Sequence, residues 1–326
     1  MKDNTNRLLA IHIMEILNKY SDASHTMSQA ELMKRLEEEY NDKISRHTCS
    51  DYLRELRSNG YIIGARGVYR KDLFSERELR TLIDGVMYGK HIPEKEAKIL
   101  IEKLKSLSLN NMRTKAKNLT YLSAINRTKN ESLYEILDVI DDAIEKGKKI
   151  EIVQYSPQID GTNKEWPAKI VDPYYVVSDQ SRYYLLCNVN RDDKPSLEPR
   201  RIDRITKIKM LNEQRVPLDD IVGHDFNLGN YMKEHVYMFS GETGIVELKI
   251  DNKAIGYLED WHGDDYKVLD TNEEYSIVRL KTNYNAIYYW LLQYGSVVEV
   301  LEPVSLREKV IQGLEEVLSK YKCQNN

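Results

Sequence analysis

The residues best suited to chemistry lie in the second half of this 326-residue chain, at positions 172–208. Two segments rich in tyrosine and β-branched residues are followed by a third that carries four charged residues in five positions. These four are Arg200, Arg201, Asp203 and Arg204. Because side chains alternate along a strand, Arg200 and Arg204 should share one face and Arg201 and Asp203 the other. Guanidinium groups beside tyrosine rings suit an anionic ligand with flat bases better than they suit catalysis.

The predicted ligand-binding residues combine rings that can stack on a base with arginines that can grip a phosphate through two N–H groups. They are Tyr155, Tyr174, Tyr183, Tyr184, Arg200, Arg201, Asp203 and Arg204. An alternative remains open, in which the tyrosines pack a barrel and Asp203 pairs with an arginine across the sheet. On a regular strand Arg201 and Arg204 face opposite ways, so both can line one pocket only if a bulge or barrel edge intervenes.

A DNA-binding domain is predicted upstream, at residues 1–72. Helical spacing of apolar residues, a capping box at Ser28–Glu31 and a good N-cap at Ser45 indicate three helices. Two short strands, 61–63 and 68–70, follow around a glycine-rich turn. This order predicts a winged helix-turn-helix, in which the third helix enters the major groove of DNA.

The third helix is expected to carry a cationic face. Residues 45–71 contain six Lys or Arg and two Asp or Glu, a local balance of +4, although the whole chain has a net charge of -4. The predicted DNA contacts are Arg46, His47, Ser50, Arg54 and Arg57 on the helix, opposite its apolar face, and Arg66 at the tip of the wing. The competing interpretation is that this charged face is merely solvated.

Downstream of the wing, the expected fold class is α+β multidomain. Residues 73–147 are predicted to form a helical linker, which either supplies a dimer contact or packs within its own domain. Strands predicted between residues 148 and 212 indicate a small β-barrel. A linker is expected at 213–242, and residues 243–326 follow the β-α-β-β-α-β order of a ferredoxin-like domain, with a capping signal at Ser305–Glu308.

Several functional classes are disfavoured by composition. No apolar run approaches the roughly 20 residues of a membrane helix, and the N-terminus lacks the apolar stretch of a signal peptide. Three widely spaced cysteines indicate a reducing compartment, so a cytoplasmic location is expected. The seven histidines are scattered, and His262–Asp265 is better explained as a turn than as a metal loop. No catalytic residue, metal or cofactor is predicted.

Together these motifs resemble the WYL-domain transcriptional regulators of bacteria. The naming tripeptide corresponds to Tyr183-Tyr184-Leu185, with tyrosine in place of the usual tryptophan. Pro173 matches the proline before that strand, and residues 200–205 match the arginine-rich strand, with Arg200 in place of an aromatic residue. The signature of the C-terminal extension corresponds to Trp290, Tyr294-Gly295, Val300 and Pro303 through Leu306-Arg307.

The resemblance implies that the barrel at 148–212 is an Sm/SH3-like WYL domain. It also implies a homodimer whose WYL domain senses a nucleic-acid fragment or nucleotide and changes DNA binding. We therefore predict a ligand-responsive transcriptional regulator, expected to be a repressor, that binds a double-stranded DNA operator. Two alternatives stay open. One is a nucleic-acid-processing enzyme, or its accessory subunit, that uses the winged helix for docking. The other is a structural dimer adaptor whose barrel binds another protein.

Overall fold

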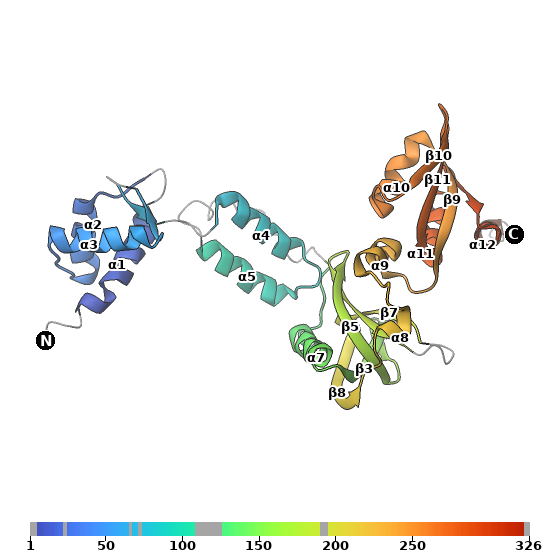
Figure 1. Cartoon of the computed structure of the whole chain (residues 1–326), viewed down its shortest axis with the longest axis horizontal. Coiled ribbons are helices and arrows are strands. Elements are labelled where there is room, and N and C mark those ends of the chain that lie inside the picture. The colour runs from blue at the N-terminus through green and yellow to red at the C-terminus, as the bar shows by residue number, and fades with distance from the viewer. Residues whose placement is uncertain are drawn as a thin grey trace. The chain divides into compact units, whose positions relative to one another are not determined.

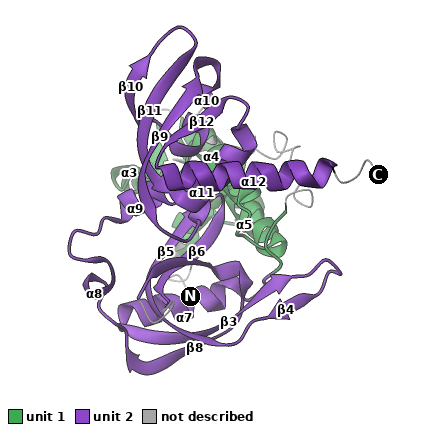
Figure 2. Ribbon diagram, turned by 90° about the vertical axis from the view of Figure 1, so that its right-hand side faces the viewer, with its two compact units in different colours: residues 1–129 green, residues 130–326 purple. Residues whose placement is uncertain are grey.

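The computed structural model describes residues 5–21, 25–64, 67–70, 74–107, 126–189 and 195–322 (Figure 1). The chain divides into two compact units, unit 1 at residues 1–129 and unit 2 at residues 130–326 (Figure 2). This division lies inside the segment that was predicted as a helical linker.

Unit 1 begins with three helices and a two-stranded hairpin. The helices are α1 (Thr5–Tyr20), α2 (Gln29–Tyr40) and α3 (Arg46–Ser58). The strands β1 (Ile62–Ile63) and β2 (Tyr69–Arg70) pair in antiparallel fashion. The predicted N-caps are present, because the Ser28 and Ser45 side chains accept hydrogen bonds from the backbone N–H groups of Glu31 and Thr48. The element order is the one expected from the sequence.

A common core holds these five elements together. It contains the apolar residues that repeat at helical spacing in α1, α2 and α3, together with residues of the hairpin. The fully or almost fully buried members are Leu9, Ile13, Ile16, Leu17, Met27, Leu32, Leu36, Cys49, Leu53, Ile62 and Val68. Because Cys49 and Leu53 use one face of α3, the opposite face of that helix is left to solvent.

A helical pair with its own small core follows in unit 1. Helix α4 (Glu76–Tyr88) begins with a complete capping box between Ser75 and Glu78, and α5 (Glu94–Ser106) begins after Pro93. The core of this pair includes Leu79, Ile83, Met87, Ala97 and Ile101.

The buried Arg127 guanidinium ties the end of unit 1 to this helical pair. It donates to the carbonyl oxygens of Gly89 (2.7 Å), Ile92 (3.0 Å) and Val86 (3.1 Å), and also to that of Met87. Val86 and Met87 lie in the last turn of α4, whose carbonyl groups have no partner within the helix. A positive charge there is also favoured by the helix dipole. Burial lowers the pKa of Arg127.

Unit 2 begins with a strongly curved antiparallel sheet. Its strands are β3 (Lys148–Pro157), β4 (Asn163–Glu165), β5 (Lys169–Asp179), β6 (Arg182–Asn188), β7 (Leu197–Arg201) and β8 (Ile205–Gln214). The strand order is β4-β3-β5-β6-β7, and β8 also pairs with β3. The short turn η2 (Ile202–Arg204) joins β7 directly to β8, so it links the two edges of the sheet.

Helix α7 (Leu133–Glu145) covers this sheet. Its apolar stripe, which includes Leu133, Ile136 and Ile140, packs in one core with Ile150 and Leu185 of the strands. The last part of the predicted helical linker therefore belongs to the sheet domain of unit 2.

The segment predicted as a linker at 213–242 contains three short helical elements. They are α8 (Asp219–Val222), α9 (Leu228–Glu234) and the 3-10 turn η3 (Val236–Met238). Leu228, Tyr231 and Met238 pack against Tyr184 and Leu186 of the sheet. Elements of three to seven residues contain too few turns to show helical periodicity, which explains why the sequence pattern did not reveal them.

The C-terminal domain follows the predicted β-α-β-β-α-β order, with one further helix. Its elements are β9 (Thr243–Asp251), η4 (Asn252–Ala254), α10 (Ile255–His262), β10 (Lys267–Thr271), β11 (Tyr275–Asn283), α11 (Tyr284–Tyr294), β12 (Val298–Glu302) and α12 (Val304–Lys322). The antiparallel sheet has the order β10-β11-β9-β12 and packs against Trp290 and Leu291 of α11. One detail was wrong: α12 begins at Val304, so Ser305 lies inside the helix and does not cap it.

Replacing Arg127 tests how much its hydrogen bonds stabilise the helical pair of α4 and α5. Arg127→Ala leaves the carbonyls of Val86, Met87, Gly89 and Ile92 without this donor, so we expect a loss of about 2–4 kcal/mol in local stability. Hydrogen exchange of the amides in α4 and α5 measures this loss. The control is Arg80→Ala, which removes an exposed arginine of α4 paired only with Asp84. If the amides of α4 and α5 were equally protected from hydrogen exchange in the two variants, Arg127 would not stabilise the helical pair.

Candidate functional site

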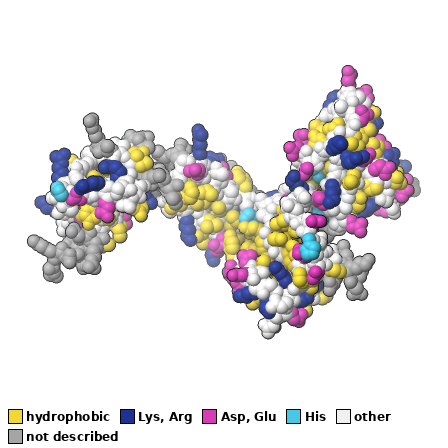
Figure 3. All heavy atoms as spheres, viewed as in Figure 1, with side chains coloured by type: hydrophobic (Ala, Val, Ile, Leu, Met, Phe, Trp, Pro, Cys, Tyr) yellow, Lys and Arg dark blue, Asp and Glu magenta, His cyan; other side chains and the backbone are white. Residues whose placement is uncertain are grey.

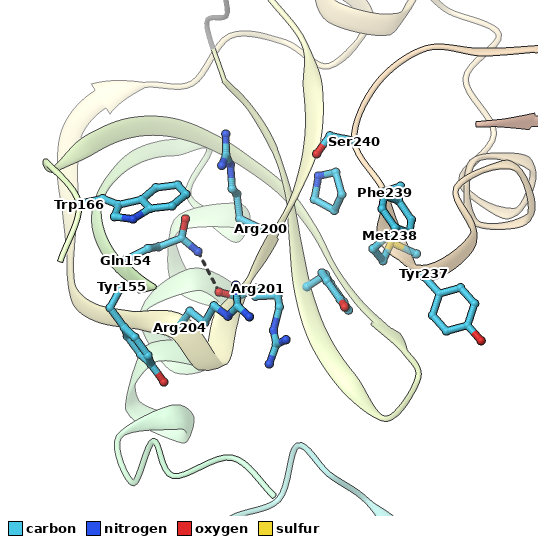
Figure 4. A pocket seen from close by; sticks show the side chains of 12 residues that line it. Gln154, Tyr155, Trp166, Arg200, Arg201, Arg204, Tyr237, Met238, Phe239 and Ser240 are labelled. Carbon is cyan, nitrogen blue, oxygen red and sulfur yellow. Dashed lines mark hydrogen bonds between the residues drawn. The ribbon is translucent and has the colours of Figure 1, made fainter. Parts of the chain in front are cut away.

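A cavity of about 470 Å³ opens on the sheet of unit 2, and its size is typical of ligand pockets. It is lined by residues of the sheet, of the turn η2 and of the segment 237–240. They are Gln154, Tyr155, Trp166, Tyr184, Pro199, Arg200, Arg201, Arg204, Tyr237, Met238, Phe239 and Ser240. Figure 4 shows Trp166, Gln154 and Tyr155 on one side of the arginines and residues 237–240 on the other. Five of the predicted ligand residues therefore lie around one hollow.

The turn η2 brings Arg201 and Arg204 to the same cavity. The sequence predicted one strand through these positions, with Arg200 and Arg204 on one face and Arg201 and Asp203 on the other. This was wrong, because the strand ends at Arg201 and residues 202–204 form a 3-10 turn. The physical reason is burial of Ile202 in the sheet core, which turns the chain inward before β8 begins.

Asp203 holds two of the guanidinium groups in place. Its Oδ1 accepts from Arg201 Nε at 2.9 Å, and its Oδ2 accepts from Arg201 Nη2 at 2.6 Å and from Arg182 Nη1 at 3.2 Å. Burial alone would lower the pKa of Arg201, but the hydrogen bonds and charge of Asp203 outweigh it and raise that pKa. Asp203 therefore orients Arg201 and does not itself line the cavity.

The remaining two arginines of the cavity differ in their pairing. Arg200 Nη2 lies 3.0 Å from Oε2 of the buried Glu198. Arg204 is half-buried and has no hydrogen-bond or ion-pair partner among the residues that the structure describes. Since Glu198 and Asp203 offset only part of the charge of the three lining arginines, the cavity favours an anion. Arg204 is the donor most available to such a ligand.

Aromatic rings complete the cavity. Trp166 follows the short strand β4 and is 42% exposed, with its indole Nε1 donating to Ser156 Oγ at 3.2 Å. Tyr155 is half-buried, while Tyr184 is buried, which raises the pKa of its hydroxyl. A partly exposed indole beside guanidinium groups can stack a flat ring while the arginines bind phosphate. Trp166 was missed from the sequence because it lies 34 residues before the arginine-rich segment.

Two predicted ligand residues lie outside the cavity lining. Tyr174 is buried, donates its hydroxyl to the Val216 carbonyl at 2.7 Å and lies beneath the Arg215 guanidinium. Tyr183 packs against the core on the α7 side of the sheet. Both positions fit the packing role that the sequence left open for these tyrosines.

The segment Tyr237–Ser240, here called the strap, contributes lining residues that the sequence did not indicate. Tyr237 and Met238 both have left-handed backbone conformations (φ 55° and 54°), which are strained for residues with a side chain. Met238 is buried against Tyr184, whereas the Tyr237 ring lies 4.4 Å from that of Trp261 in α10. Phe239 stacks on Tyr289 of α11 at 5.5 Å. The strap thus contacts both the sheet and the C-terminal domain.

In unit 1, α3 presents the predicted DNA contacts to solvent. Arg46, His47, Ser50, Arg54 and Arg57 are all exposed. Figure 3 shows Lys and Arg side chains over this part of unit 1. Arg66 lies outside the described residues.

Local contacts organise this face of α3. Asp51 pairs with His47 at 2.9 Å and with Arg54, whereas Arg46 and Arg57 form no ion pair within the described residues. Gln29 of α2 donates to the Arg46 carbonyl at 2.7 Å and to Ser50 Oγ at 2.8 Å. These bonds fix the N-terminal turns of α3 against α2, and the pattern used to find the helices did not reveal the role of Gln29.

Within the described part of the chain, no group of three or more His, Cys, Asp or Glu residues is placed to hold a metal ion. None of the described helices has the length and apolar character needed to cross a bilayer.

Comparisons with known families place two domains in unit 2. Residues 135–210 match the WYL domain, and residues 242–318 match the WCX domain. The first match includes α7 and the sheet that carries the arginines, and the second begins just after the strap. The chain therefore contains a WYL domain and a WCX domain, as its motifs indicated.

Solved structures show only distant similarity. Proteasome accessory factor B/C (PafBC) of Arthrobacter aurescens is 18% identical, with 96% of this chain covering 48% of that one at a TM-score of 0.29. This chain thus spans about half the length of PafBC. A CRISPR Cas-related protein is 13% identical, with 97% and 86% coverage and a TM-score of 0.37. A comparison with curated proteins finds no significant match. The assignment of these two domains therefore rests on the two domain matches and the motifs.

The cavity can be tested with the fluorescence of Trp166. Titration with short 5′-phosphorylated oligodeoxynucleotides should quench it in a saturable manner, because a base stacks on the indole. Arg204→Ala should raise the Kd about tenfold or more, since a charge-assisted hydrogen bond is lost. Trp166→Phe should remove the signal, and Arg279→Ala, which removes an exposed cation of β11, should bind normally. Equal Kd values for Arg204→Ala and the unmodified protein would argue against this site.

Proposed function

We propose that this protein is a ligand-responsive, DNA-binding transcriptional regulator. The observation that carries the proposal is the exposed cationic face of α3, which follows two helices and precedes a hairpin. In a winged helix-turn-helix the third helix of such an order enters the major groove. Arg46, His47 and Ser50 occupy its N-terminal half, from which base edges are usually contacted. Arg54 and Arg57 continue the same face toward the phosphate backbone.

The ligand of the proposal is a nucleotide or a nucleic-acid fragment. The cavity offers guanidinium groups for phosphate, with Arg204 unpaired in the described structure, and it offers Trp166 and Tyr155 for flat rings. This combination supports an anionic ligand with bases more directly than a neutral small molecule. The curved sheet that carries these residues is proposed to be the Sm/SH3-like barrel expected from the sequence.

The strap provides a physical route from the ligand to the rest of unit 2. A ligand that enters the cavity meets Met238 and Phe239, and Phe239 also stacks on α11. Asn285 of α11 donates to the Ser240 carbonyl at 2.9 Å. In the proposed mechanism, ligand binding shifts the strap and with it the C-terminal domain. In a homodimeric repressor, such a shift changes the spacing of the two DNA-reading helices.

The DNA-binding proposal is tested by replacing single arginines of α3. Arg54→Ala and Arg57→Ala should each weaken binding to duplex DNA and lower the slope of log K against log salt by about 1, because each arginine neutralises a phosphate. Fluorescence anisotropy with a labelled duplex over a salt series measures both quantities.

The matched control for this titration is Arg80→Ala, which removes one positive charge from α4. It should leave the affinity and the salt slope unchanged. If Arg54→Ala and Arg57→Ala bind DNA as the unmodified protein does, α3 is not the DNA-binding face.

A further inference from the structure

Helix α12 carries apolar side chains that its own domain does not bury. Of its 19 residues, Leu306, Val310 and Gly313 pack against the domain, whereas every residue from Leu314 to Lys322 is exposed. Figure 2 shows the C-terminal half of α12 extending beyond the sheet of its domain. A helical segment of this length is marginal in water without tertiary packing. A partner that covers it would explain both its helical conformation and its composition.

Most of the exposed apolar residues of α12 form one seam, and the 42% exposed Val317 lies beside it, toward the buried side of the helix. Ile311, Leu314, Leu318 and Tyr321 follow each other at spacings of three, four and three residues, and their exposed fractions lie between 42% and 74%. This is the a/d pattern of a coiled-coil helix. Val304, one heptad before Ile311, is also exposed and lies on the same stripe. The opposite side of the helix carries polar residues, including Gln312 and Ser319.

We propose that this seam pairs with the same seam of a second copy of the chain, with the two helices antiparallel. An antiparallel pair centred near residue 316 places Ile311 against the second copy's Tyr321 and Leu314 against the second copy's Leu318. All four seam residues of each copy are then covered. The contact is self-complementary about a two-fold axis, as a dimer of identical chains requires.

Charge complementarity supports the antiparallel direction. Glu308 and Lys322 flank the seam on the same edge, and neither has an ion-pair partner within the described residues. Glu308 lies eight residues before the centre of the pair and Lys322 six residues after it. In the antiparallel pair Glu308 therefore lies within about 3 Å, along the axis, of the second copy's Lys322. A parallel pair would instead place Glu308 and the second copy's Lys322 on opposite edges of the dimer, about 21 Å apart along the axis.

One contact of the proposed pair is unfavourable, and it gives a directional test. Glu315 lies on the same edge next to the two-fold axis, so the two copies of this carboxylate face each other. Removing its charge should therefore strengthen the association. The inference rests on the homodimer of the proposed function and names the surface that forms it.

The seam is tested on the full chain by sedimentation velocity over a concentration series. The unmodified protein should be a dimer, and Leu314→Glu combined with Leu318→Glu should raise the dimer Kd at least about tenfold, because four carboxylates enter an apolar seam. The control is Gln312→Glu combined with Ser319→Glu, which adds the same charge to the outer side of α12 and should leave the dimer intact. Circular dichroism and thermal unfolding confirm that each variant is folded.

The direction of the pair is tested by exchanging charges. Glu308→Lys and Lys322→Glu should each weaken the dimer, the two together should restore it, and Glu315→Gln should strengthen it. A double exchange that fails to restore the dimer overturns the antiparallel pair. A dimer that tolerates the Leu314 and Leu318 changes overturns the seam but leaves a homodimer. A protein that is monomeric at every concentration overturns both, while the α3 titration still tests DNA binding separately.

Discussion

The burial of Ile202 is the constraint on which the arginine-lined cavity depends. The Ile202 side chain lies wholly inside the sheet core. The backbone turns inward at residues 202–204, which places this side chain in the core. The turn places Asp203 beneath Arg201, where the carboxylate accepts two hydrogen bonds from one guanidinium. It also delivers Arg204 to the same hollow without a partner in the described structure. A buried apolar residue thus sets the geometry of a cationic site, because a regular strand would have separated these arginines.

Packing against apolar and aromatic neighbours also positions the strap residues that line the cavity. Residues 237–240 lie between the matched WYL and WCX domains and belong to neither. Met238 is held in the apolar core beside Tyr184, and its neighbours Tyr237 and Phe239 contact α10 and α11. Two consecutive left-handed residues are tolerated because contacts on both sides hold them. A ligand in the cavity therefore meets a strained segment that is attached to the C-terminal domain.

The sequence predicted what depends on local pattern and missed what depends on long-range packing. Apolar spacing and the caps at Ser28 and Ser45 correctly located the first three helices of unit 1. Alternation of strands and helices correctly predicted the element order of the C-terminal domain. The break at Ile202 was missed because it depends on a core assembled from distant strands. Trp166 and the strap were missed because only the fold brings them to the arginines.

The predicted ligand residues also divide into those that line the cavity and those that do not. Five of the eight predicted ligand residues line the cavity, and Asp203 supports it from behind. Tyr174 and Tyr183 resemble Tyr184 in sequence, since all three lie on the tyrosine-rich strands β5 and β6. Only the register of β5 and β6 shows that they point elsewhere, with Tyr174 bonded to Val216 and Tyr183 packed under α7. Residue type thus indicated which strands lie around the cavity, and the strand register determined which of their side chains line it.

The central claim is that occupation of the arginine cavity changes DNA binding by α3. The most direct measurement is the Kd for a labelled DNA duplex at fixed salt, with and without a saturating 5′-phosphorylated oligodeoxynucleotide, in the unmodified protein and in Arg204→Ala. The account predicts that the oligonucleotide changes the Kd of the unmodified protein, and that Arg204→Ala binds the duplex normally but loses this response. A Kd that is the same with and without the oligonucleotide, or a response that persists in Arg204→Ala, would contradict it.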